Sequence, residues 1–197
     1  MTTNVDRLAV AMAVGDPLAD QVLDGQASLS PVAIPGIEPT VVWRVRDESG
    51  SHPWQRYVGA WPDGTVRVLT ADQGAWDDLV AATGADLRDE GQARAYVETY
   101  LEVTRGAMVI VRPVESLDQL RWRPGSDDEE ANKAALLADP PVVAPVAART
   151  TDGFHVELTL VVDQRLQRNE FDVDPDGRIT RTSFRVLAER LPLPIAR

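Results

Sequence analysis

The feature that most constrains the fold is the last quarter of the chain, residues 142–191, in which stretches of alternating apolar and polar residues are separated by short turns. Residues 154–162 begin with the alternation of a half-buried strand, because successive side chains of a strand point to opposite sides. Residues 174–177, Asp-Pro-Asp-Gly, then supply a turn, since proline fixes φ and glycine accepts a positive φ. Residues 142–188 are therefore predicted to form an antiparallel meander.

The region before the meander contains further predicted strands and helices. Three segments rich in β-branched and aromatic residues are predicted to form a small antiparallel unit, at residues 41–46, 54–61 and 65–70. A long helix is predicted at 89–105, because Tyr96, Tyr100 and Leu101 recur on one side of it. These patterns together predict an α+β fold in which a curved antiparallel sheet packs on one long helix.

The chain is predicted to form a single domain with a helical arm. Residues 1–24 show apolar side chains at helical spacing and form the arm, while residues 25–197 form the α+β domain. Residues 25–39 contain three prolines and no sustained period, which predicts an irregular connection. Residues 124–140 are predicted to be a mobile acidic excursion, partly helical because acidic residues suit the positive end of a helix dipole.

The order of these elements resembles the cystatin-like and NTF2-like α+β layouts, in which a helical arm and helices accompany a curved run of long strands. The resemblance concerns layout and is not accompanied by a residue motif. Proteins of this layout include cyclases, isomerases, ligand carriers and non-catalytic interaction domains. The layout therefore implies a fold and leaves the activity open.

Composition excludes several classes of function. A net charge of −11 gives a surface that repels a phosphate backbone, so no nucleic-acid partner is expected. No apolar run approaches the roughly 20 residues that span a bilayer, and residues 1–25 lack the pattern of a signal peptide. We therefore expect a cytoplasmic protein with no membrane partner. The chain has no cysteine, which removes disulfides, thiolate metal sites and cysteine nucleophiles.

One segment partly matches a calcium-binding loop. Residues 172–179 carry carboxylates at positions one, three and five and a glycine at position six, as in the first half of an EF-hand. The twelfth position, where a bidentate glutamate should complete the calcium shell, is Ser183. We therefore predict a β-turn here and no metal site, and no motif in the chain predicts a cofactor.

His155 and Glu157 are the best candidates for catalytic residues. They are two apart on a predicted strand and so share one face with Thr159. An imidazole beside a carboxylate is the pairing that general acid and base catalysis needs near neutral pH. The other interpretation is structural: on an exposed sheet face, acidic side chains pair with arginines in a cross-strand charge ladder. The acidic residues are Glu157, Glu170 and Asp172, and the arginines are Arg165, Arg168, Arg181 or Arg185.

The catalytic interpretation also needs a pocket. If the helix at 89–105 covers the face that carries Thr159, Tyr96 and Tyr100 would form its roof, and these three residues are the predicted ligand contacts. The only other histidine that could act as a base is His52, which lies in a polar loop.

Two hypotheses about function follow from these patterns. The favoured one is a non-catalytic binding or accessory protein that associates with a protein partner or with itself, because the chain lacks a nucleophile motif, a metal cluster and a phosphate loop. Most of the five tryptophans are expected to be core residues, and an exposed subset would mark an interface. The contacts of such a binding protein would come from exposed aromatic residues on the early strands, which carry Trp43, Trp54 and Trp61. The alternative is a small-molecule cyclase, isomerase or hydrolase that uses the His155–Glu157 pair, so whether the protein is an enzyme stays open.

Overall fold

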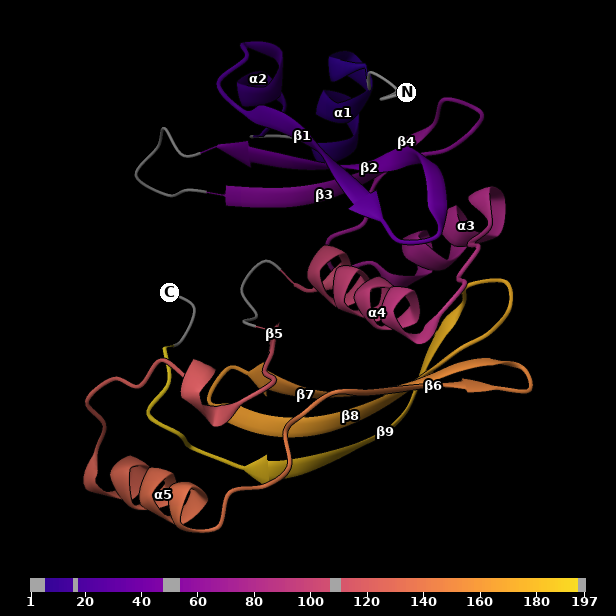
Figure 1. Cartoon of the computed structure of the whole chain (residues 1–197). Helices are drawn as coiled ribbons and strands as arrows, with labels where there is room; N and C mark the ends of the chain where they lie inside the picture. Colours follow the sequence, from indigo (N-terminus) through magenta and orange to yellow (C-terminus); the bar gives the residue numbers. More distant parts are fainter. Residues whose placement is uncertain (1–5, 16–17, 48–53, 107–110, 195–197) are drawn as a thin grey trace. The chain divides into compact units, whose positions relative to one another are not determined.

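The computed structural model describes residues 6–15, 18–47, 54–106 and 111–194, and it has the predicted α+β fold. The described strands form two antiparallel sheets, one of four strands and one of five (Figure 1). The contacts within the chain separate it into two compact units, each containing one of the sheets. The first unit holds the chain up to Arg88, part of a long helix and the turn Pro175–Arg178, and the second unit holds the rest.

The first sheet consists of four strands in sequence order, each antiparallel to the next: β1 (Ser28–Ile34), β2 (Ile37–Asp47), β3 (Trp54–Ala60) and β4 (Val66–Val68). The prediction of an irregular connection at 25–39 was wrong, because this segment contains β1 and the start of β2. Pro31 is tolerated in β1 because β1 is an edge strand, where the missing amide donor breaks no ladder.

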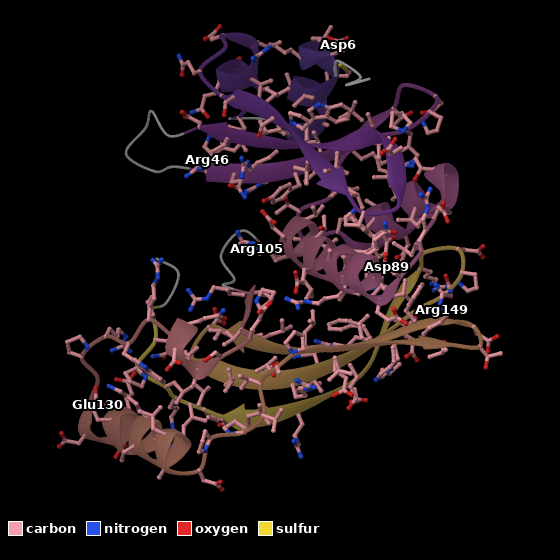
Figure 2. The ribbon with its side chains drawn as sticks, in the orientation of Figure 1. Asp6, Arg46, Asp89, Arg105, Glu130 and Arg149 are labelled. Atoms are coloured by element: carbon pink, nitrogen blue, oxygen red, sulfur yellow. The ribbon has the colours of Figure 1, made fainter. Side chains whose placement is uncertain are left out.

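Two short helices of the predicted arm, α1 (Arg7–Val14) and α2 (Leu18–Leu23), pack on one face of this sheet. Val10 and Val22, both fully buried, belong to the same apolar cluster as Trp43 of β2. Asp6, which is labelled in Figure 2, precedes α1. It caps the helix, since its carboxylate accepts a hydrogen bond from the backbone N–H of Leu8 at 3.0 Å. The arm is thus part of the core of the first unit.

Helix α3 (Gln73–Thr83) packs on the opposite face of the first sheet. A Cβ atom placed on Gly59 of β3 would lie 2.9 Å from Cδ2 of Leu79, which shows how closely the helix approaches this strand. The neighbouring residue Val58 belongs to the cluster under α1 and α2, and successive strand residues face opposite sides.

Helix α4 (Glu90–Thr104) confirms the long helix predicted at 89–105. On its predicted inner side Tyr96 is fully buried, Tyr100 is 8% exposed and Leu101 is half-buried. The residues of the helix up to Glu98 belong to the second unit, and those from Thr99 belong to the first.

The second sheet contains the predicted meander. Its strands are β5 (Val111–Pro113), β6 (Val146–Thr150), β7 (Gly153–Val162), β8 (Arg165–Val173) and β9 (Ile179–Ala188). Strands β6 to β9 pair successively, as the alternation and turns predicted (Figure 1). The short strands β5 and β6 pair with different parts of the same edge of β7, which leaves β9 as the opposite edge of the sheet.

Helix α5 (Asp127–Ala138) occupies the predicted acidic excursion and follows a short 3-10 turn, η1 (Leu117–Gln119). It starts with a capping box, in which Ser126 and Glu129 satisfy each other's backbone amides. The carboxylate of Glu129 also accepts hydrogen bonds from Arg123 at 2.6 Å and Gln164 at 2.9 Å. These bonds and the buried Leu136 fix α5 to the second unit.

Candidate functional site

The predicted polar row on β7 is present in the second unit. Phe154, Val156 and Leu158 are buried, while the side chains of His155 and Glu157 are 31% and 30% exposed. The alternation of the sequence therefore placed the two candidate residues on one face, away from the buried apolar side chains.

His155 is oriented by a carboxylate of the neighbouring strand. Its Nδ1 atom lies 2.8 Å from Oδ1 of Asp172, which is its direct partner in the β7–β8 register. Its Nε2 atom lies 3.9 Å from Oε1 of Glu157, beyond hydrogen-bond distance. The imidazole thus makes its close contact with Asp172 and not with the carboxylate that the sequence paired with it.

Glu157 is bound to Arg168 of β8. Oε2 of Glu157 accepts hydrogen bonds from Nε of Arg168 at 3.0 Å and lies 2.8 Å from Nη2 of Arg168. The same guanidinium donates to Oγ1 of Thr159 at 3.2 Å and to the carbonyl of Ala144 at 2.7 Å. Glu157 is thus held in an ion pair with Arg168 and is not directed at the imidazole of His155. This part of the row is the cross-strand charge ladder that the sequence offered as the structural interpretation.

The two predicted roof residues lie in other surroundings. Tyr96 is fully buried, and Tyr100 packs edge-on against Trp76, with the ring centroids 5.6 Å apart. Thr159 is also buried, at 1% exposed. Of the five predicted site residues, the structure therefore brings together three in one row: His155, Glu157 and Thr159. The other histidine, His52, lies outside the described residues.

The first unit contains an apolar groove of about 550 Å³. Its walls come from α1, β2, β3, the β3–β4 turn and the end of α3, and its aromatic surface comes from Trp43 and Trp61. Trp43 is almost fully buried, so little of its surface is open to the groove, whereas Trp61 is half-buried. The volume lies within the range of ligand sites in proteins, which is roughly 300–1,000 Å³.

Trp61 is held in place on two sides. The guanidinium of Arg67 lies 4.9 Å from the centroid of the Trp61 ring, and Arg67 is bound to Asp78 of α3 at 3.1 Å. A Cβ atom on Gly59 would lie only 3.2 Å from Cζ3 of Trp61. The indole is therefore a preorganised aromatic surface, which costs little conformational entropy when a ligand binds.

The charged groups that line the groove are all negative. Asp6 and Glu38 are both exposed and line it, and no lysine or arginine is among the described lining residues. Ala82 and Thr83, in the last turn of α3, also line it, and that turn carries no basic residue to balance the negative end of the helix dipole. The groove therefore combines apolar walls with a negative rim.

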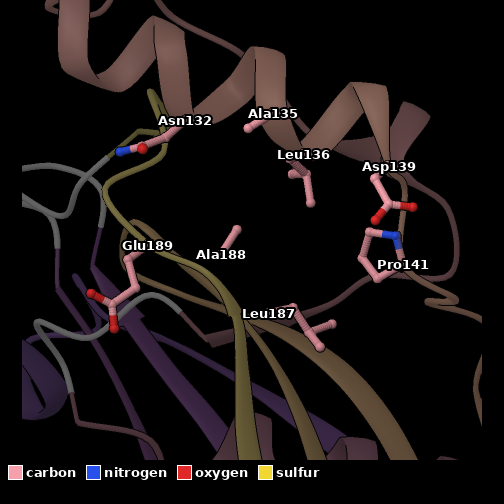
Figure 3. A pocket seen from close by; sticks show the side chains of 8 residues that line it. All are labelled: Asn132, Ala135, Leu136, Asp139, Pro141, Leu187, Ala188 and Glu189. Atoms are coloured by element: carbon pink, nitrogen blue, oxygen red, sulfur yellow. The ribbon is translucent and has the colours of Figure 1, made fainter.

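A second pocket of about 440 Å³ lies between α5 and the end of β9 in the second unit (Figure 3). Leu136 of α5 and Leu187 of β9 line it from opposite sides, and the exposed residues Asp139 and Glu189 lie toward its two ends. The predicted catalytic and ligand-binding residues line neither this pocket nor the groove of the first unit. Within the second unit, the polar row on β7 is thus separate from the α5 pocket.

Comparison of the chain with protein-family models, with curated proteins and with solved structures found no match. In the part of the chain that the structure describes, no three or more His, Asp or Glu side chains gather in an arrangement suited to a metal ion. None of the helices in the described segments has both the length and the apolar surface needed to cross a membrane.

The sequence pointed to some of these features and missed others. It identified Trp43 and Trp61 as aromatic residues of early strands. No pattern marked Asp6 and Glu38 as binding residues, because they reach the groove only through folding of the arm and β2. Asp172 was seen only as a turn or ladder residue, since its position opposite His155 depends on the strand register.

Proposed function

We propose that the protein is a non-catalytic binding protein, and that the groove of the first unit holds a segment of a partner protein. The observation that carries the proposal is the half-buried Trp61, which Arg67 fixes at the wall of an open apolar groove. Preorganised Trp side chains in pockets are typical energetic centres of protein interfaces. The proposal agrees with the expectation from the sequence that early aromatic residues carry the contacts.

The chemistry of the groove favours a partner segment that is both apolar and basic. Trp43, Trp61 and Val66 offer surface to an apolar side chain, while Asp6 and Glu38 attract a neighbouring lysine or arginine. A small uncharged ligand would leave both carboxylates without a counter-charge. We therefore commit to a segment of a partner protein in which a basic residue adjoins an apolar one.

The test uses three peptides that differ in one residue: Ac-Ala-Leu-Arg-Leu-Ala-NH2 and the versions with Gln or Glu in place of Arg. The protein is labelled with 5-fluorotryptophan, and the ¹⁹F resonance of Trp61 is assigned from Trp61→Phe. We expect the Arg peptide to shift this resonance saturably, the Gln peptide to bind more weakly and the Glu peptide not to bind.

Variants then show whether the groove is the site, with binding measured by calorimetry because Trp61→Ala lacks the reporting indole. Trp61→Ala should weaken binding of the Arg peptide by about tenfold or more, as at an interface hot spot. Trp122→Ala is the matched control, because Trp122 is also half-buried with a cation, Lys133, over its ring at 5.2 Å, but it lies in the second unit. Equal losses in both variants, or no shift with any peptide, would contradict the proposal. A Trp61 shift that depends on protein concentration without peptide would indicate self-association.

The alternative function, a small-molecule cyclase, isomerase or hydrolase, is favoured by one observation. The imidazole of His155 is partly exposed and bound to Asp172 at 2.8 Å, the arrangement that orients a catalytic histidine. The hydrolase case is tested with p-nitrophenyl acetate, comparing the chain with His155→Ala and Asp172→Asn. A rate above that of free imidazole that is lost in His155→Ala would support the enzyme, and equal rates in all three proteins would eliminate this activity.

A further inference from the structure

We propose that β9 is a second interaction surface, at which an extended acidic segment of a partner protein adds a strand to the second sheet. The inference is independent of the groove in the first unit. It rests on the free edge, the exposure and the charge of β9.

The first observation is that β9 is a long edge strand with one paired side. It contains ten residues and no proline, and the backbone of residues 180–186 bonds within the described structure to β8 alone. Alternate backbone N–H and C=O groups of such a strand point away from the sheet and are ready to pair with another chain.

The other edges in the described part of the molecule differ from β9. Strand β1 carries Pro31, β4 and β5 have three residues each, and β6 has five. Short strands and proline are two of the means by which proteins prevent pairing at an edge. Strand β9 lacks both.

The second observation is exposure on both faces of the strand. Residues 180–185 are all exposed, and they include Phe184, which is 54% exposed. An added strand would cover Phe184 with a neighbour on its own face of the sheet, as cross-strand pairs do.

The third observation is charge, and it selects the partner. Within β9 the charged residues are Arg181 and Arg185, and neither forms an ion pair with a described residue. Arg185 lies directly opposite Arg168 in the register, and Arg168 already pairs with Glu157, so β8 offers Arg185 no carboxylate at this position. Carboxylates on an incoming strand would supply that partner. Two copies of β9 would instead bring four arginines together, so we commit to an acidic partner segment.

The test uses the full chain and the probe Ac-Glu-Thr-Val-Glu-Val-Thr-Glu-NH2, with a Lys-for-Glu peptide as its control. Hydrogen exchange of the β9 amides is followed by NMR. We expect the acidic peptide to slow exchange of alternate β9 amides by about tenfold or more at saturation, and the Lys peptide to leave it unchanged. A third peptide, the acidic probe N-methylated along its pairing edge, keeps the charge but cannot form the ladder and should not protect these amides.

Charge-reversal variants complete the test. The double variant R181E/R185E should bind the acidic peptide about tenfold more weakly and gain affinity for the Lys peptide. Its control is R46E/R88E, which changes the net charge equally but at two exposed arginines of the first unit that do not line the groove. If R181E/R185E fails to fold, R181Q/R185Q replaces it. The proposal would be overturned if the acidic peptide did not bind, if the N-methylated peptide bound equally well, or if the control variant lost as much affinity. Protection of β9 that rises with protein concentration alone would also overturn it.

Discussion

The guanidinium of Arg67 lies over the indole of Trp61, with Cζ 4.9 Å from the ring centroid, and links that indole to Asp78 of α3. These two contacts connect the β3–β4 turn, which carries Trp61, to helix α3. It explains why a tryptophan can remain half-buried at the wall of an apolar groove with its ring in a fixed orientation.

Replacing Arg67 with Gln should therefore loosen Trp61 without unfolding the first unit. Cation–π contacts at exposed sites and surface ion pairs each contribute at most about 1 kcal/mol, so the loss of stability should be small. The 5-fluorotryptophan resonance of Trp61 should change in position and width, and binding of the Arg peptide should weaken by a few-fold, about 0.5–1 kcal/mol. Asp78→Asn is the control, because it removes the ion pair but keeps the cation over the ring. Unchanged resonances in Arg67→Gln would show that the cation does not orient Trp61.

A second prediction concerns the glycine under the same indole. In Gly59→Ala the new methyl group would lie 2.9 Å from Leu79, so Leu79 must move, and it would also crowd Trp61 at 3.2 Å and Leu69 at 3.3 Å. Overpacking of this kind typically costs about 1–3 kcal/mol of unfolding free energy. Gly74→Ala in α3 is the control, since its methyl group meets only Asp72 Oδ1 at 3.4 Å and alanine favours a helix by up to about 1 kcal/mol. Urea unfolding should show that Gly59→Ala lowers the free energy of unfolding and that Gly74→Ala raises it. Equal stability in both would contradict the close packing.

A third prediction compares two neighbouring residues of α4. Tyr100 is 8% exposed and packs against Trp76, whereas Leu101 is half-buried. Tyr100→Ala should lower the free energy of unfolding by about 2–5 kcal/mol, and Leu101→Ala by less, because less of its surface leaves water on folding. Thermal unfolding provides the measurement. A larger loss for Leu101 would mean that the helix presents a different side to the core.

Much of the fold could be predicted because its signals are local. The alternation on β7 and the turn at 174–177 specify the meander, and the apolar spacing on α4 specifies a helix, each from residues close in sequence. Strand β1 could not be predicted in this way. Pro31 argues against a strand unless the strand lies at an edge, and that position is set by pairing with β2, a property of the whole sheet.

The candidate sites also combine features that local sequence predicts with features that depend on the whole fold. The common face of His155 and Glu157 follows from the two-residue period of a strand. The contact of His155 with Asp172 depends on the register of β7 and β8, which the sequence does not state. The groove needs residues from α1, β2 and α3 to meet, so from the sequence only its tryptophans could be identified.

The last prediction is a pH dependence of stability at the start of α5. The backbone N–H of Ser126, the guanidinium of Arg123 and the amide of Gln164 all bind the carboxylate of Glu129, and together they lower its pKa from 4.5 to about 2. A lowered pKa in the folded state means that these contacts stabilise the ionised form. Their contribution is therefore complete above pH 4.5 and is lost as the pH falls toward 2.

Replacing Glu129 with Gln removes this dependence while keeping an acceptor for the amide of Ser126. The wild-type chain should be more stable than Glu129→Gln at pH 6, and the difference should shrink steadily between pH 4.5 and pH 2. Asp128→Asn is the control for loss of a negative charge from the same turn, because the Asp128 side chain is 84% exposed and its contact with Arg190 is long, at 4.0 Å. Urea unfolding at a series of pH values measures all three proteins. A difference between wild type and Glu129→Gln that is the same at pH 6 and pH 2 would show that the ionised carboxylate does not hold α5 to the second unit.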